Sequence, residues 1–280
     1  MNNVKTVVLL GLLSGVLLVG GQALGGRNGL WMGLAVALVM NAGSYFFSDK
    51  IALAMYSAQR VSEQENRQVY RRLAPLVENL RQRMDMPMPR LWVIPEQAPN
   101  AFATGRNPAH ASVAVTAGLL EAMDDRELEG VLAHELGHVR NRDILICTIA
   151  ATLGAAITFL ARMAFFFGGR SNEDEEGGNP LAGLLMLILA PVAALLIQMA
   201  ISRTREYGAD ASAARYSGGP GGLISALRKL EAYSKRIPMD ASPATAHMFI
   251  IQPLTGATLM RLFSTHPATE ERIARLRALA

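Results

Sequence analysis

Four long apolar runs limit most strongly what this chain of 280 residues can fold into. Each one approaches or exceeds the roughly 18–20 residues that a helix needs to cross about 30 Å of hydrocarbon. The runs cover residues 4–24, 30–47, 144–167 and 181–201. Buried core helices are the alternative, and it is stronger for the last two runs because Arg162, Pro191 and Gln198 interrupt them. The runs therefore predict a mostly α-helical membrane protein with four hydrophobic helices.

The distribution of Lys and Arg predicts how these helices are oriented. The turn between the first two runs carries only Arg27, and the acidic, glycine-rich loop at 168–180 carries only Arg170. Nearly all other basic residues lie in residues 49–143 and from residue 202 onward. Because cytoplasmic loops are enriched in Lys and Arg, both of these segments and both termini are expected in the cytoplasm. A weak cleavage site after the first run indicates a retained signal anchor rather than a cleaved signal peptide.

Composition argues against several other classes of protein. The formal net charge is +4, but no basic patch interleaved with aromatic residues is present, so we expect no nucleic-acid partner. The basic residues are instead expected near anionic lipid, where they favour binding to the membrane surface. Cys147 is the single cysteine, so no disulfide can form within the chain, as is usual in a reducing compartment.

Residues 134–138 read His-Glu-Leu-Gly-His, a pattern typical of metal sites. Histidines four apart on a helix share one face, with Cβ atoms about 5–6 Å apart, so His134 and His138 can reach a single ion. Glu135 lies between them and can act as the general base on a water held by the metal, which is the chemistry of zinc peptidases. The alternative is that the two histidines share a helix face but bind no metal. Asp124 is expected to cap this helix, and Gly137 indicates close approach by another element or by substrate.

A catalytic zinc site uses three protein ligands and a water, so a third ligand is required. Asp143 is five residues beyond His138, and on a continuous helix it would point away from the two histidines. Glu206 is better placed, and Asp210 shares its helix face and could accept a hydrogen bond from a ligand imidazole. The alternative is that Glu206 is a surface charge paired with a neighbouring arginine. The candidates considered are Asp143, Glu206, Asp210, Glu231 and His266.

A small sheet is predicted ahead of the histidine helix. Residues 91–94 lie between prolines and are prone to form a strand, and residues 112–116 alternate like another strand. Residues 106–109 would turn the chain from 100–105 into the second of these strands as a hairpin. Residues 49–85 have a helical pattern in which Pro75 is expected to kink or split the helix. These features give four parts: an N-terminal transmembrane hairpin (1–48), a cytoplasmic part with the sheet and the zinc helix (49–143), a second hydrophobic hairpin (144–201), and a cytoplasmic part with the third ligand (202–280).

Four features occur in one order along almost the whole chain: the 134–138 pentad, a hydrophobic hairpin, Glu-Tyr-Gly-Ala-Asp at 206–210, and Ser-Thr-His-Pro-Ala-Thr-Glu-Glu-Arg-Ile at 264–273. In this order they resemble the HtpX family of membrane-bound zinc endopeptidases, which are related to the CaaX prenyl proteases and to the wider gluzincins. The resemblance implies an α+β, gluzincin-like protease domain in the cytoplasm. It also implies a bacterial cytoplasmic (inner) membrane location and one Zn²⁺ per chain. Its substrates would be peptides or damaged membrane proteins, cleaved for quality control at a site that faces the cytoplasm, and the lipid bilayer would be its other partner.

The resemblance also implies roles for particular residues. His134, His138 and Glu206 would bind zinc, and Glu135 would be the catalytic base. Asp210 would not bind the metal but would accept a hydrogen bond from a ligand imidazole. His266 would donate to the oxyanion, Arg272 would orient substrate backbone or a nearby carboxylate, and Asn100 would open an edge strand that receives the peptide. No feature predicts an oligomeric state.

Two rival functions are weighed against this one. An intramembrane protease would carry its pentad within an apolar span, whereas this pentad has charged flanks (Glu127, Glu129, Arg140 and Arg142). A metal-binding scaffold without activity would have no use for Glu135 between the histidines.

Overall fold

The computed structural model describes residues 2–146, 149, 203–237, 248–251 and 267–279. The third and fourth apolar runs lie almost entirely outside the described residues, as does His266. The two hydrophobic helices that the sequence predicts there are therefore left as predictions.

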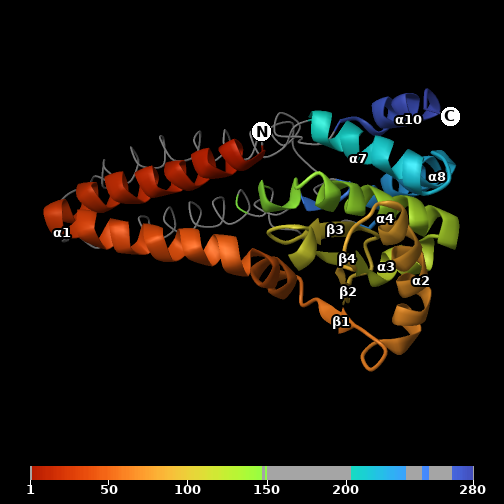
Figure 1. Ribbon diagram of the computed structural model, residues 1–280, viewed down its shortest axis with the longest axis horizontal. Coiled ribbons are helices and arrows are strands. Elements are labelled where there is room, and N and C mark those ends of the chain that lie inside the picture. The colour runs from red at the N-terminus through yellow and green to blue at the C-terminus, as the bar shows by residue number, and fades with distance from the viewer. Residues whose placement is uncertain (1, 147–148, 150–202, 238–247, 252–266, 280) are drawn as a thin grey trace.

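The N-terminal element α1 (Asn2–Met55) is a helical hairpin whose arms extend away from the rest of the chain (Figure 1). The chain reverses near Gly26, where φ is +55°, a conformation that costs glycine little. The arms approach closely because Gly33 has no side chain, and a Cβ there would lie 2.5 Å from the carbonyl oxygen of Leu17. Asn41 Nδ2 also donates to Ser14 Oγ across the hairpin at 2.8 Å. The two arms thus pack against each other, and a transmembrane hairpin over residues 1–48 stays a prediction.

One helix in the described residues, Gly26–Phe47, is long and apolar enough to cross a membrane by length and composition. The apolar helix of the first arm, Val7–Gln22, is shorter, at 16 residues. This length falls short of the roughly 17–25 residues usual for a span. The described part of the chain therefore supports one of the four predicted membrane helices directly.

A four-stranded mixed sheet follows α1, in the order β1-β2-β4-β3. The parallel pair at its centre is β2 (Arg90–Ile94) and β4 (Ser112–Thr116), and β3 (Ala101–Thr104) runs antiparallel to β4 at one edge. The predicted hairpin is confirmed, with the short helix η1 (Pro108–His110) in its turn. The other edge strand, β1 (Gln59–Val61), lies in a segment that the sequence pattern assigned to a helix.

The predicted helix over residues 49–85 is wrong in one respect. It is broken by β1 rather than at Pro75, which lies inside the continuous helix α2 (Arg67–Arg83). Pro75 is the ninth of the 17 residues of α2, so the helix continues through it even though a proline in a helix interior removes one backbone hydrogen bond. Leu73 and Val77 of this helix are fully buried, so packing against the core holds it in place.

Helix α4 (Asp125–Arg140), which carries the pentad, lies at the centre of the described fold (Figure 1). The sheet, α2 and the short helix α3 (Ala117–Ala122) lie on one side of it. On its other side are α7 (Arg203–Tyr216) and α8 (Gly221–Ser234), and α10 (Thr269–Arg277) packs on these two. The segments before and after residues 144–201 therefore share one core, which places the pentad between the sheet and α7.

Gly137 permits the close contact between α4 and α7. A Cβ at this position would lie 3.1 Å from Cα of Ala209 and 3.0 Å from Cβ of Ser212. The close approach of another element that the sequence predicted at this glycine is thus confirmed, and that element is α7.

Two matched substitutions test this contact. Replacing a helical glycine with alanine stabilises a helix by about 1 kcal/mol when the methyl group fits. At Gly208 on α7, the nearest described atom to a new Cβ is 3.7 Å away, so Gly208→Ala should raise the melting temperature of the protein. Gly137→Ala should fail to raise it, because the methyl group would push α4 and α7 apart. An equal gain in melting temperature for both variants would contradict the close packing.

Candidate metal centre

The pentad lies on the buried side of α4. Asp124 caps the helix by accepting from the backbone N–H of Glu127, whose side chain in turn accepts from the backbone N–H of Asp124. This reciprocal pair is a capping box, and it fixes where the helix starts. His134 is 0% exposed and Glu135 is 1% exposed. The predicted cap at Asp124 is therefore confirmed, and it positions the pentad inside the protein.

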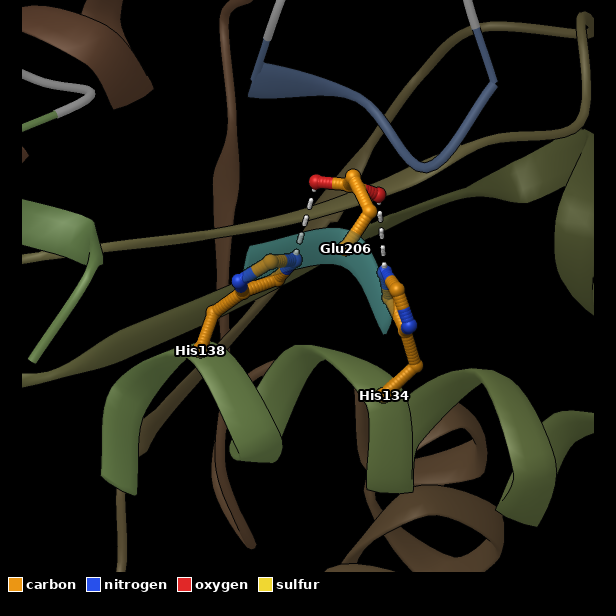
Figure 2. Close-up of side chains that lie close together, drawn as sticks. All are labelled: His134, His138 and Glu206. Carbon is orange, nitrogen blue, oxygen red and sulfur yellow. Dashed lines mark ion pairs between the residues drawn. The ribbon is translucent and has the colours of Figure 1, made fainter. Parts of the chain in front are cut away.

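Glu206 comes from α7 and faces both histidines (Figure 2). Its two carboxylate oxygens lie 3.6 Å from Nε2 of His134 and 3.4 Å from Nε2 of His138. One donor atom from each of the three side chains lies within 4.8 Å of the other two. The alternative that Glu206 is a surface charge is wrong, because only 6% of this residue is exposed.

The three side chains fit a tetrahedral metal ion. Ligand bonds of about 2.0–2.1 Å at tetrahedral angles would place the donor atoms about 3.3 Å apart. The two oxygens of Glu206 lie 3.6 and 3.4 Å from Nε2 of His134 and His138, and single donor atoms of the three residues lie within 4.8 Å of one another, so the side chains would draw somewhat closer around an ion. Two imidazoles and one carboxylate are also the donor set of many catalytic sites that keep a position for water. The residues present can therefore hold one metal ion with little rearrangement.

A carboxylate lies behind each histidine. Asp210 Oδ1 is 2.9 Å from Nδ1 of His134, and Asp143 Oδ2 is 3.4 Å from Nδ1 of His138. Each carboxylate can accept the Nδ1 proton, which leaves Nε2 of that ring directed at Glu206 and available to a metal. Such pairs fix the tautomer and the orientation of ligand imidazoles.

The position of Asp143 corrects the expectation that it points away from the histidines. That expectation assumed a helix running past residue 140, but α4 ends at Arg140. Arg142 then takes a left-handed conformation, with φ of +59°, and the backbone N–H of Asp143 donates to the carbonyl of His138. This turn brings Asp143 back to His138. The sequence signal that was missed is the polar stretch 140–143 directly after the pentad.

Burial keeps the imidazole of His134 in the neutral form that can bind a metal. Burial lowers the pKa of His134 to about 4, although the hydrogen bond with Asp210 opposes this. The imidazole is therefore neutral at pH 7, as metal binding requires. Burial alone would raise the pKa of Asp210, but the Arg272 charge and the hydrogen bond with His134 outweigh it and lower that pKa to about 2.

Without a bound metal, the pKa of His138 shifts in the opposite direction. Burial lowers its pKa, but the nearby charge of Glu206 and the hydrogen bond with Asp143 outweigh burial and raise that pKa well above the ordinary value. In the absence of a metal the ring therefore takes up a proton, and the proton and the metal compete for the same lone pair.

Arg272 on α10 anchors this group of charges. Its Nε and Nη2 atoms donate to the two oxygens of Asp210 at 2.9 and 2.7 Å, and its Nη1 donates to the carbonyl of Ile250 at 2.9 Å. The residue is 1% exposed. The sequence offered substrate backbone or a nearby carboxylate as its partner, and the structure places it on the carboxylate of Asp210.

Glu135 lies on the side of α4 that faces the sheet edge. Burial raises its pKa to about 7, opposed by the nearby His138 and by a hydrogen bond from the backbone N–H of Ala103. Ala103 belongs to the edge strand β3, so this bond fixes the carboxylate between the histidines and the sheet. A carboxylate with a pKa near neutrality is suited to taking and returning a proton.

Asn100 precedes β3 and is buried. Its Nδ2 donates to the carbonyl of Ile251 at 3.1 Å, and its Oδ1 accepts from the backbone N–H of Ala101. The backbone N–H of Ile250 also donates to the carbonyl of Ala101. In this structure Asn100 thus joins the edge strand to residues 250–251, and its contact with a peptide stays a prediction. His266, the predicted oxyanion donor, lies outside the described residues.

The contact between Asp143 and His138 gives a testable effect on metal affinity. Removing a carboxylate that orients a ligand histidine typically costs 10–100-fold in metal affinity. We therefore expect Asp143→Ala to weaken metal binding by about this factor, measured by competition with a chromophoric chelator. Asp125→Ala is the control, because Asp125 is exposed at the far end of α4. An unchanged affinity in Asp143→Ala would show that the carboxylate does not orient the ring.

Known proteins are similar to this chain over most of its length. Residues 63–280 match the profile of Peptidase family M48. "Protease HtpX homolog" of Desulforapulum autotrophicum is 55% identical over 280 residues, covering 99% of this chain and 89% of that protein. The chain belongs to peptidase family M48, in its HtpX group. The proteins of the same name from Desulfatibacillum aliphaticivorans and Ralstonia pickettii are 56% and 52% identical, over 98% and 100% of this chain and 89% and 97% of theirs.

A solved structure shares the fold of this chain. The crystal structure of S. mikatae Ste24p matches 98% of this chain with a TM-score of 0.54 and 20% sequence identity. This chain spans 65% of the length of that one. Membership of family M48 makes the chain a metalloprotease, and the cluster of His134, His138 and Glu206 is where the structure can hold the metal.

Proposed function

We propose that this HtpX-type protein is a zinc-dependent endopeptidase of the bacterial cytoplasmic membrane. It would cleave damaged or misfolded membrane proteins at a site that faces the cytoplasm. The observation that carries the proposal is the convergence of His134, His138 and Glu206 from two helices beside the buried Glu135. The donor set of two imidazoles and one carboxylate favours zinc, since this set is common in zinc peptidases.

Zinc held by these side chains would act as a Lewis acid and lower the pKa of a water towards about 7. The protein groups then perform the proton transfers. Glu135 would take the proton of the attacking water and return it to the leaving amine, while the N–H of Ala103 holds its carboxylate in place. Asp210 and Asp143 would keep both ligand rings oriented throughout. His266 would supply a hydrogen bond to the oxyanion.

The substrate would lie along the sheet edge. Strand β3 is at the edge of the sheet, and the hydrogen bond from Ala103 links it to Glu135. A peptide that adds a strand to this edge would gain backbone hydrogen bonds in a fixed register, and it would replace the backbone N–H of Ile250 that donates to the carbonyl of Ala101. Its scissile bond would thereby be presented to the metal and to Glu135.

The membrane location is supported by α1. Its second arm contains an apolar helix of 22 residues, and the segments rich in Lys and Arg lie on the protease side of it. By the positive-inside rule this side is the cytoplasm. Substrates embedded in the same bilayer would then be held close to the site.

Cleavage by the full-length protein in proteoliposomes tests the proposed function. We expect it to cut an unstructured membrane-protein substrate, to stop when a chelator is added, and to resume when Zn²⁺ is restored. A soluble substrate such as casein provides the comparison for membrane substrates. Activity that persists in the apoprotein would contradict the proposal.

A further inference from the structure

A cavity of about 430 Å³ lies where the second arm of α1 meets the sheet, away from the metal centre. Tyr45, Phe46 and Phe47 line it from α1, and Arg106 and His110 line it from the turn between β3 and β4. Its volume is in the range of small-molecule sites. The cavity is thus formed jointly by the candidate membrane helix and the protease domain.

The charged side chains of this cavity are mostly basic. Lys50, Arg90 and Arg106 line it together with one carboxylate, Asp49. Arg90 Nη2 donates to Asp49 at 2.7 Å, so these two charges offset each other. Within the described ranges, no carboxylate lies at ion-pair distance from Lys50 or Arg106. Two cationic side chains are therefore available to an anion that enters the cavity.

Two aromatic rings accompany these two cations. The guanidinium of Arg106 lies 5.5 Å from the ring centroid of Phe46, and the ammonium of Lys50 lies 5.3 Å from that of Phe47. Both rings are about half exposed, at 54% and 51%. A tyrosine, Tyr45, lies beside them in the cavity wall, and tyrosine at the end of an apolar helix is typical of the boundary between hydrocarbon and head groups.

The position of the cavity along α1 decides which anion fits. The candidate span Gly26–Phe47 ends at the cavity wall. Along that arm, apolar side chains such as Val39 (72% exposed) are open to the surroundings. A ligand with a phosphate in the cavity and acyl chains along the arm would therefore satisfy both the cations and the apolar surface. Basic pockets next to membrane helices bind lipid head groups in this way.

We propose that this cavity binds the phosphate head group of an anionic phospholipid. The inference rests on the proposed insertion of α1 in a bilayer. Phosphate would accept charge-assisted hydrogen bonds from Lys50 and Arg106, and the acyl chains would lie against the exposed face of the arm. Because Arg106 and His110 belong to the turn that follows β3, the bound lipid would also tie the edge strand beside Glu135 to the membrane surface.

Native mass spectrometry of the full-length protein in detergent tests this proposal. The protein is titrated with phosphatidylglycerol, with phosphatidylcholine of the same acyl chains, and with soluble glycerol phosphate. We expect the wild type to retain phosphatidylglycerol in preference to the other two. Each basic side chain is expected to contribute about five-fold to affinity, so Lys50→Ala/Arg106→Ala should weaken phosphatidylglycerol binding by about 30-fold.

The matched control removes the same charges elsewhere. Arg67→Ala/Lys235→Ala changes two exposed basic residues away from the cavity and should leave lipid binding within about two-fold of the wild type. Unchanged metal content in all variants shows that the fold is intact, and Arg106→Gln alone serves if the double variant does not fold. Equal retention of both lipids, or an equal loss in the control, would overturn the proposal.

Two further outcomes identify the cause of a failure. Equal affinity for glycerol phosphate and for phosphatidylglycerol would show that the cavity takes a soluble phosphate, which contradicts the lipid assignment. Extraction of the protein from membranes by alkaline carbonate would contradict membrane insertion itself. A protein that stays in the membrane but shows no preference for anionic lipid contradicts the cavity proposal alone.

Discussion

Replacing Glu135 with glutamine should lower peptide hydrolysis by a factor of about 10² to 10⁴, the usual contribution of a general base, while the metal content stays unchanged. Glutamine has nearly the shape of glutamate, and its carbonyl oxygen can still accept from the N–H of Ala103. It cannot take a proton from water at neutral pH. Because the side chain is not one of the three converging ligands, the metal should remain bound.

Glu129→Gln is the matched control for this experiment. Glu129 lies on the same helix, but it pairs with Arg83 at 3.5 Å and is partly exposed. Its replacement should leave turnover close to the wild-type rate. Full activity of Glu135→Gln would show that another group accepts the proton.

Removing Arg272 should produce the largest loss of stability. The side chains of Arg272 and Asp210 are only 2% and 4% exposed, and they are joined by two hydrogen bonds. Breaking a buried pair from one side leaves an uncompensated charge and typically costs 3–5 kcal/mol. We therefore expect Arg272→Met to lower the melting temperature of the full-length protein by about 10 °C. Arg277→Met, at an exposed position on the same helix, should change it little.

A double replacement separates stability from metal binding. In Arg272→Met/Asp210→Leu both charges are gone, so the melting temperature should recover part of the loss seen in Arg272→Met. Metal affinity should still fall, because His134 loses the carboxylate that holds its Nδ1. A double variant less stable than Arg272→Met would contradict the view that the unpaired charge causes the loss.

The sequence predicts the arrangement of the pentad because that arrangement depends on local spacing. His134, Glu135 and His138 occupy one turn of one helix, and the helix start at Asp124 has its own local signal. The hairpin of β3 and β4 is likewise predicted from two short alternating runs around a turn. Local patterns of this kind are largely independent of the rest of the fold.

Features that depend on tertiary structure were harder to predict. Spacing alone left Glu206 open between ligand and surface charge, and the resemblance to the HtpX family was needed to assign it as a ligand, since only the packing of α7 on α4 brings it to the histidines. β1 has three residues and is held by pairing with β2, which no periodicity records. Asp143 was misplaced because a left-handed residue, Arg142, ends the helix sooner than its pattern indicates.

Metal analysis of the purified full-length protein tests the central claim most directly. The measurement compares the wild type with Glu206→Ala and with Glu231→Ala, which removes a carboxylate on α8 instead. The wild type and Glu231→Ala should each carry one zinc ion per chain, and Glu206→Ala should carry almost none under the same conditions. A Glu206→Ala protein that still binds one zinc ion per chain with unchanged affinity would contradict the claim that residues 134, 138 and 206 form one metal site.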